Sequence, residues 1–160
     1  MSEFATGADR ETTAKNRLRL WLRLLKVSRK VESELRENLR REFSTTLPRF
    51  DVMAALSRYD KGLKMSALSN VLKVSNGNVT GIVDRLVTDG IIIRTPVPGD
   101  KRASLVHLTP KGAEEFARQA KAHEVWVDRL LSGIEADDAE SISLLLKQAS
   151  KRIEQQENGK

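Results

Sequence analysis

Apolar residues recur at helical spacing over most of the chain. From about Thr13 to Phe43 they follow one another at four-residue steps beside a stripe of leucines, which predicts one long helix. Shorter stretches with the same spacing predict helices near residues 48–58, 63–74 and 75–90. In the last of these, the side chains expected to point into a core are Val79, Ile82, Val83 and Leu86.

The pattern changes after residue 90 and predicts a β-hairpin. Three β-branched isoleucines stand together at 91–93, and a second strand is expected over 105–108. The segment between them, 96–102, contains prolines and a glycine that should exclude regular structure and place two cations at the tip. Two short helices joined by a tight link at 73–75 and followed by such a hairpin are typical of a winged helix-turn-helix.

Several helix ends carry cap residues. Thr46 can cap the helix at 48–58, and Ser75 can cap the helix that follows it in the chain. Gly90 can supply the left-handed residue that closes that helix. Thr109 as a cap, with proline after it, predicts the start of a further helix.

That further helix should run to about Gly133, and a last one from about Asp137 to Gln156. Neither has a second core to pack against, so with the first long helix they are expected to form a dimerisation bundle. The fold class is therefore mainly α with a small β-hairpin. The expected parts are a disordered N-terminus at 1–12, dimerisation helices at 13–47 and 110–156, a winged helix-turn-helix at 48–109 and a frayed tail at 157–160.

The face of the 75–90 helix that should be exposed is small and polar. It holds Asn76, Gly77, Thr80, Gly81 and Asp84, whereas a helix that only meets solvent would normally carry Glu and Lys. Glycines and asparagines weaken a helix, which suggests that another molecule approaches closely. Short hydrogen-bonding side chains at a helix start match base edges in a DNA major groove, and free N–H groups match phosphate.

Composition excludes several kinds of site. The 160 residues include no cysteine, which excludes disulfides, thiolate metal sites and thiol redox sensing. His107 and His123 stand in no metal-ligand spacing, so neither a metal nor a cofactor is expected. No apolar run reaches the length of a membrane span, and the first residues lack the apolar core of a signal peptide. A cytoplasmic protein without a membrane partner is expected.

Charge is distributed unevenly along the chain. The net charge of +6 permits nucleic-acid binding but does not show it. Residues 64–112 carry 7 basic and 3 acidic side chains, whereas 113–160 carry 7 and 10. Cations alternate with leucines along the first helix. They form either a solvated face or the lining of a pocket for an anionic ligand. These cations are Arg17, Arg19, Arg23, Lys26, Arg29 and Lys30.

The hairpin carries a family resemblance. The stretch GDKRASLVHLTPKG places Asp100, Arg102, Leu108, Thr109 and Gly112 in the D-x-R…L-T-x-x-G pattern of the MarR (multiple antibiotic resistance regulator) family. SNGNVTGIVDRLVTDG is similar to that family's recognition helix, and the order of helices agrees over roughly 15–155. TTLPRFDVMAAL and SNGNVTGIVDRL also resemble the subgroup that senses hydroxycinnamoyl-CoA or related aromatic catabolites.

The resemblance implies a homodimeric transcriptional regulator, usually a repressor, of pseudo-palindromic operator DNA. By analogy Arg85 supports the recognition helix or touches backbone, Asp100 orients the wing, and Arg102 enters the minor groove, whose negative potential suits a guanidinium. A salt bridge inside the hairpin is the alternative role for Asp100 and Arg102. The residues expected at DNA are Ser75, Asn76, Gly77, Asn78, Thr80, Arg85, Asp100, Lys101 and Arg102.

The resemblance also implies an effector, a small aromatic, phenolic or other anionic compound. An aromatic acyl-CoA carries several phosphate charges, which the cations of the first helix could meet. Each candidate residue also fits a plain core or surface role. The expected ligand residues are Arg17, Arg19, Trp21, Arg23, Leu24, Lys26, Phe50 and Met53, with His123 as a further candidate.

Two other functions compete with this interpretation. An enzyme is disfavoured because the chain has no cysteine, no Ser/His/Asp signature and no phosphate-cradling glycine loop. A winged helix that contacts protein, without sequence-specific DNA binding, would be favoured by an acidic or apolar recognition face. Asn76, Asn78 and Thr80 argue for DNA instead.

Overall fold

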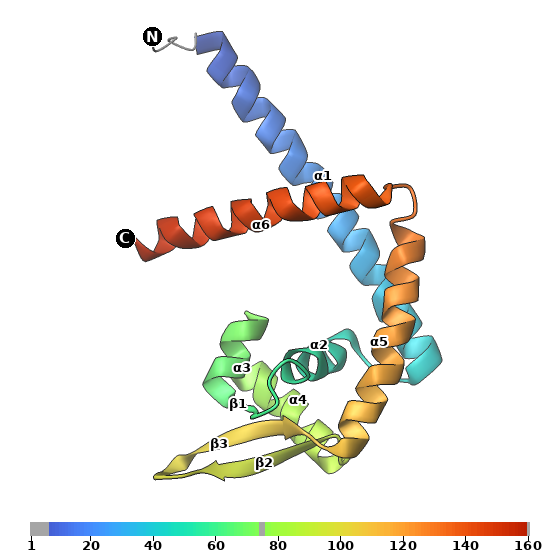
Figure 1. Cartoon of the computed structure of the whole chain (residues 1–160), viewed down its shortest axis with the longest axis vertical. Helices are drawn as coiled ribbons and strands as arrows, with labels where there is room; N and C mark the ends of the chain where they lie inside the picture. Colours follow the sequence, from blue (N-terminus) through green and yellow to red (C-terminus); the bar gives the residue numbers. More distant parts are fainter. Residues whose placement is uncertain (1–6, 74–75, 160) are drawn as a thin grey trace. The chain divides into compact units, whose positions relative to one another are not determined.

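Helices make up most of the fold, as the sequence predicts, and the predicted β-hairpin belongs to a small three-stranded sheet. The computed structural model describes residues 7–73 and 76–159. The chain divides into two compact units, one up to Glu124 and one from Val125 onward. The described elements are α1 (Gly7–Phe43), α2 (Leu47–Leu56), β1 (Leu63–Lys64), α3 (Met65–Leu72), α4 (Asn76–Thr88), β2 (Ile92–Val97), β3 (Asp100–Leu108), α5 (Pro110–Leu130) and α6 (Ala136–Asn158), labelled in Figure 1.

The sheet is antiparallel, with strand order β1-β3-β2. Leu63 pairs with Val106, and Ile92 pairs with Leu108. The sequence prediction placed residues 63 and 64 in a helix, and this was wrong. A strand of two residues is too short to produce an alternating pattern, so only its pairing with β3 reveals it.

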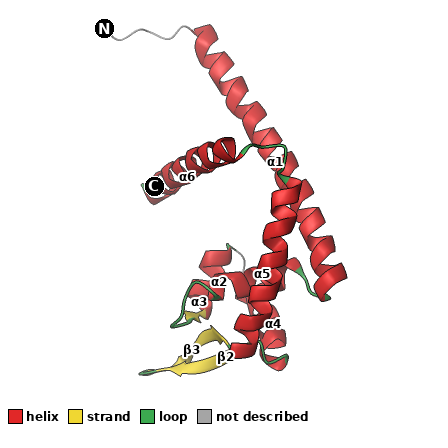
Figure 2. Cartoon of the chain, turned by 45° about the vertical axis from the view of Figure 1, so that its right-hand side comes forward, coloured by secondary structure: helices red, strands yellow, loops and turns green. Residues whose placement is uncertain are grey.

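The β2–β3 hairpin extends beyond the helices around it (Figures 1 and 2). The expectation that residues 96–102 lack regular structure was wrong, because β2 continues through Pro96 and β3 begins at Asp100. β2 is an edge strand, so a proline can be accommodated without interrupting a central ladder. The pairing also shifts next to this proline, between Pro96 and Val97.

One apolar core joins α2, α3, α4 and the sheet. Val52 of α2, Leu68 of α3, Val83 of α4 and Val106 of β3 are each 0% exposed. The other buried members of this cluster are Met53, Ala55, Leu56, Val79, Leu86, Ile91 and Ile92. The winged helix-turn-helix is thus held as one packed body, which fixes α4 relative to the hairpin.

The first and last helices are longer than predicted. Residues 7–12, expected to be disordered, are helical, and Lys15 lies 2.6 Å from Glu11 in an ion pair one turn apart that supports this helix. α6 continues to Asn158, so the tail expected to fray from residue 157 is helical at its start. None of the described helices is both long and apolar enough to cross a membrane.

Candidate nucleic-acid interface

The helix-turn-helix consists of α3 and α4. α3 ends at Leu72, and the next residue, Lys73, adopts a left-handed conformation with φ of 57°. On α4, Val79, Val83 and Leu86 are fully buried, and Ile82 is partly buried and packs against the same core, which confirms the predicted core face. The opposite face of α4 is therefore the one presented to solvent. Its described members Gly77, Thr80, Gly81 and Asp84 are exposed.

The two glycines of α4 have empty space in front of them. A Cβ atom built on Gly77 or Gly81 would meet no described atom within 4 Å. Neither glycine has the positive φ that would itself demand this residue. Packing within the chain therefore gives no reason for two residues that weaken the helix, and the bare backbone is open to a molecule from outside.

A glycine and a threonine join α4, the sheet and α5. Gly90 has φ of 73° and closes α4 as predicted, while the Ile91 N–H donates to the Leu86 carbonyl at 2.9 Å. The Thr109 hydroxyl donates to the Gly90 carbonyl at 2.6 Å and accepts from the Gly112 N–H at 3.0 Å. The L-T-x-x-G part of the family pattern is therefore a structural joint that sets the base of the hairpin.

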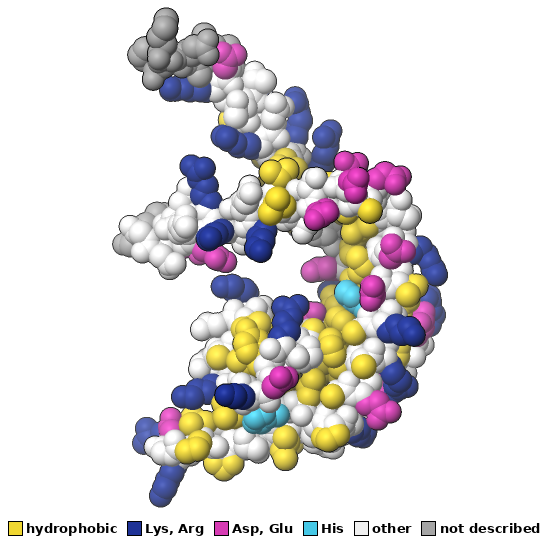
Figure 3. Space-filling model, viewed as in Figure 1, with side chains coloured by type: hydrophobic (Ala, Val, Ile, Leu, Met, Phe, Trp, Pro, Cys, Tyr) yellow, Lys and Arg dark blue, Asp and Glu magenta, His cyan; other side chains and the backbone are white. Residues whose placement is uncertain are grey.

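The end of the hairpin presents two cations. Pro96 pairs with Ser104 and Val97 with Asp100, so residues 101–103 have no partner on β2. The Asp100 carboxylate accepts the Arg102 backbone N–H at 3.0 Å, and the described ion pairs include none between these two side chains. Lys101 and Arg102 are exposed, and Lys and Arg side chains gather at this end of the molecule (Figure 3).

The acidic side chains near α4 are compensated. Arg94 of β2 lies 2.6 Å from the Asp84 carboxylate, which also ties the hairpin to α4. Arg49 of α2 lies 2.5 Å from Asp89 just after the helix. In contrast, Arg85 makes no ion pair with any residue that the structure describes, and the same holds for Lys101 and Arg102. The exposed surface of α4 and the hairpin is therefore left with positive charge.

The predicted DNA-binding residues fall on two connected elements. Ser75 lies outside the described residues, and Asn76 is the first residue of α4. The other predicted residues are all exposed: Gly77, Asn78, Thr80 and Arg85 on α4, and Asp100, Lys101 and Arg102 on β3.

The family profile described as MarR family matches residues 45–104, which span α2 to the middle of β3. The uncharacterized HTH-type transcriptional regulator YkoM of Bacillus subtilis is 32% identical over 119 residues, covering 74% of this chain and 75% of that protein. The chain belongs to the MarR family. It is therefore a DNA-binding transcriptional regulator and not an enzyme, as the sequence predicts.

Solved structures of the family agree with this assignment. A MarR family regulator from Silicibacter pomeroyi shares 33% identity at a TM-score of 0.73, covering 88% of this chain and 97% of that one. A mutant of MarR from E. coli complexed with operator DNA shares 28% identity at a TM-score of 0.72, covering 84% and 95%.

In this MarR-family chain the predicted ligand residues divide between the buried core and the surface of α1. Phe50 and Met53 are core residues, 6% and 2% exposed, and the Phe50 ring stacks on His123 with centroids 4.7 Å apart. Burial lowers the pKa of His123 below its ordinary value. Leu24 is half-buried on α1. The remaining predicted residues, Arg17, Arg19, Trp21, Arg23 and Lys26, are exposed on the same helix.

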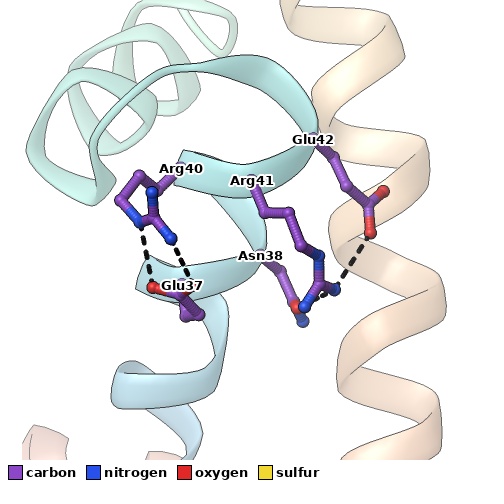
Figure 4. A network of polar contacts seen from close by, with 5 residues as sticks. All are labelled: Glu37, Asn38, Arg40, Arg41 and Glu42. Carbon is purple, nitrogen blue, oxygen red and sulfur yellow. Dashed lines mark hydrogen bonds and ion pairs between the residues drawn. The ribbon is translucent and has the colours of Figure 1, made fainter.

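Cations at the two ends of α1 differ in their pairing. Near its C-terminus Arg40 binds Glu37 through two hydrogen bonds, and Arg41 donates to Asn38 at 2.8 Å (Figure 4). In the earlier half, the described ion pairs include none with Arg17, Arg23 or Lys26. These three side chains are therefore open to an anion, as are Arg29 and Lys30, which also form none of the described ion pairs.

Two cavities of the DNA-binding region were not predicted. One, of about 270 Å³, lies where α2, β3 and α5 meet; its lining includes Tyr59, Asp60 and His107. The other, of about 370 Å³, lies among α2, α3 and α4. Each cavity is lined by residues from several elements that lie apart in the sequence, so no local motif in the sequence predicts it.

Proposed function

We propose that this chain is a ligand-responsive repressor that binds pseudo-palindromic operator DNA as a homodimer. The observation that carries the proposal is the open space in front of Gly77 and Gly81. A helix weakened by two glycines that its own fold does not need is explained by close approach to a DNA groove.

The major groove is met by the first turns of α4. Asn78 and Thr80 are exposed there, together with the bare backbone of Gly77. Amide and hydroxyl groups of this kind donate to and accept from base edges. Ser75 and Asn76 belong to the same contact, and Arg85 meets backbone phosphate.

The minor groove is met by the end of the hairpin. Because Asp100 holds the Arg102 backbone N–H, the turn is fixed and the guanidinium is presented outward. Arg102 enters the groove, and Lys101 contacts phosphate beside it. Asp84 and Asp89, whose negative charge would repel DNA, are held by Arg94 and Arg49.

Dimerisation uses the flanking helices. α1 exposes Leu18, Leu20, Trp21 and Leu22, each at more than half of its surface. α6 has no buried residue, and it exposes Ile142, Leu144, Leu145, Leu146 and Ile153. Covering these side chains with a second copy places two recognition helices about 34 Å apart, one turn of DNA. Sedimentation of the full chain tests this: a stable monomer at micromolar concentration would contradict it.

The effector is a small aromatic anion or an aromatic acyl-CoA. Arg17, Arg23 and Lys26 form no ion pair with a described residue and are available to its charges, and Trp21 is exposed beside them. A ligand that favours another spacing of the recognition helices weakens DNA binding by its differential affinity for the two states. Calorimetry with an aromatic acyl-CoA and its free acid tests the class. Binding of the free acid alone would remove the role of the basic helix.

The DNA-binding proposal is tested by selecting genomic fragments on the full chain and measuring gel shifts on the enriched sequence. A palindromic site with half-sites about 10 base pairs apart and a steep loss of affinity with salt are expected. Enrichment of no sequence would favour a winged helix that contacts protein.

A further inference from the structure

The cavity of about 370 Å³ lies beside α4, and the exposed Asn78 forms part of its wall. Its size falls in the range of small-molecule sites, about 300 to 1,000 Å³. It opens to solvent and is walled by described residues of three helices. The lining residues are Pro48, Asp51 and Val52 from α2, Leu72 from α3, and Asn78 and Ile82 from α4.

The chemistry of the lining is apolar with one acid. Four of the six residues offer only carbon surface, and the polar groups are the Asn78 amide and the Asp51 carboxyl. The Asp51 side chain forms no hydrogen bond or ion pair with any residue that the structure describes. Although it reaches solvent at the cavity mouth, the neighbouring helices desolvate it, and with Glu32 of α1 this raises its pKa above the ordinary value.

We propose that this cavity binds a small organic cation, with an apolar body against Val52, Leu72 and Ile82 and an ammonium or amidinium group on Asp51. A bound cation pairs with the Asp51 carboxylate, which has no ion-pair partner among the described residues. It also offsets the repulsion between Asp51 and Glu32. An organic anion meets the Asp51 carboxylate and no described cation in the lining. This site therefore has the opposite charge preference to the cluster on α1.

The site is coupled to DNA through Asn78, and this part rests on the proposed function. Asn78 belongs both to the cavity wall and to the surface that meets the major groove. A ligand that holds the Asn78 amide competes with a base edge for the same hydrogen bonds. Linkage then requires that operator DNA lower the affinity for the cation by the same factor as the cation lowers the affinity for DNA.

The test measures binding of three matched probes to the full chain without DNA. Benzamidine, benzamide and benzoate share a benzene ring and differ in charge, and calorimetry gives their affinities. Benzamidine should bind about tenfold more tightly than benzamide, as expected for a charge-assisted hydrogen-bonded pair, and benzoate should bind most weakly. Equal binding of benzoate and benzamidine would overturn the proposal.

Two substitutions in the cavity and one control outside it locate the binding. Asp51→Asn keeps the shape of the side chain and should remove the preference for benzamidine over benzamide. Asp60→Asn, which removes an exposed carboxyl at the other cavity, should leave it unchanged. Ile82→Phe, checked by thermal melting for an intact fold, should fill the space and weaken both probes. Unchanged benzamidine binding in folded Asp51→Asn protein would place the cation elsewhere and refute the site.

Gel shifts with and without benzamidine separate this inference from the proposed function. A chain that binds operator DNA but shows no preference for benzamidine refutes the cation site alone. A chain that binds benzamidine through Asp51 but selects no DNA refutes the proposed function and leaves the site standing.

Discussion

Gly112 packs so closely on Ile91 that a Cβ atom at position 112 would overlap the Ile91 carbonyl oxygen. That oxygen is held in place, because it accepts hydrogen bonds from the Thr109 N–H and hydroxyl. Gly112→Ala must therefore move the start of α5 away from the base of the hairpin. We expect a loss of about 1 to 3 kcal/mol in the free energy of unfolding, typical of overpacking. Urea denaturation of the full chain measures it.

Gly81→Ala is the matched substitution with the opposite expectation for stability. Its Cβ meets nothing within 4 Å, and the residue lies inside α4. Replacing a helical glycine by alanine should stabilise the protein by about 0.5 to 1 kcal/mol. Because the new methyl group occupies the face proposed to approach DNA, affinity for the selected operator should fall. A more stable protein with unchanged operator affinity would contradict close approach at this position.

Arg102→Ala tests the wing. The guanidinium has no ion-pair partner among the described residues, so the fold should keep its stability while operator affinity falls by about 1 to 3 kcal/mol. The slope of log affinity against log salt should decrease by about one. Arg36→Ala on α1 removes another exposed guanidinium and should change neither quantity. Equal effects of the two substitutions would mean that Arg102 acts only through net charge.

The sequence predicts the helix order and the recognition face because both depend on regular spacing. Val79, Val83 and Leu86 repeat at helical intervals, and their burial follows directly from that repeat. Gly90 and Thr109 act as predicted because cap chemistry depends on a few neighbouring residues. Local rules of this kind can be read without knowledge of the tertiary fold.

What the sequence does not predict depends on contacts between distant segments. The strand at Leu63 exists only because β3 lies beside it, and Pro96 fits a strand only because that strand is at an edge. Phe50 and Met53, expected at a ligand, are covered by the packing of α2 into the core. The cavity beside Asp51 likewise needs three helices to be assembled before it exists.

The stack of His123 on Phe50 predicts a pH dependence of stability. Burial lowers the pKa of His123 in the folded state below its ordinary value of 6.5, so the unfolded chain binds the proton more readily. Its contribution to stability is therefore fully present above the ordinary pKa and is lost as the pH falls through that value toward the lowered one.

His123→Phe keeps an aromatic ring beside Phe50 but cannot take up a proton. The free energy of unfolding is measured by urea denaturation at pH 7.5 and at pH 5.5. Between these two values it is expected to fall less for this variant than for the wild type. The comparison stays above the usual carboxyl range because Asp51, whose pKa is raised, contributes with the opposite sign: its folded form holds the proton more tightly, so stability decreases as the pH rises through its titration. The same fall in the variant and the wild type would show that folding does not lower the pKa of His123, contrary to its partial burial against Phe50.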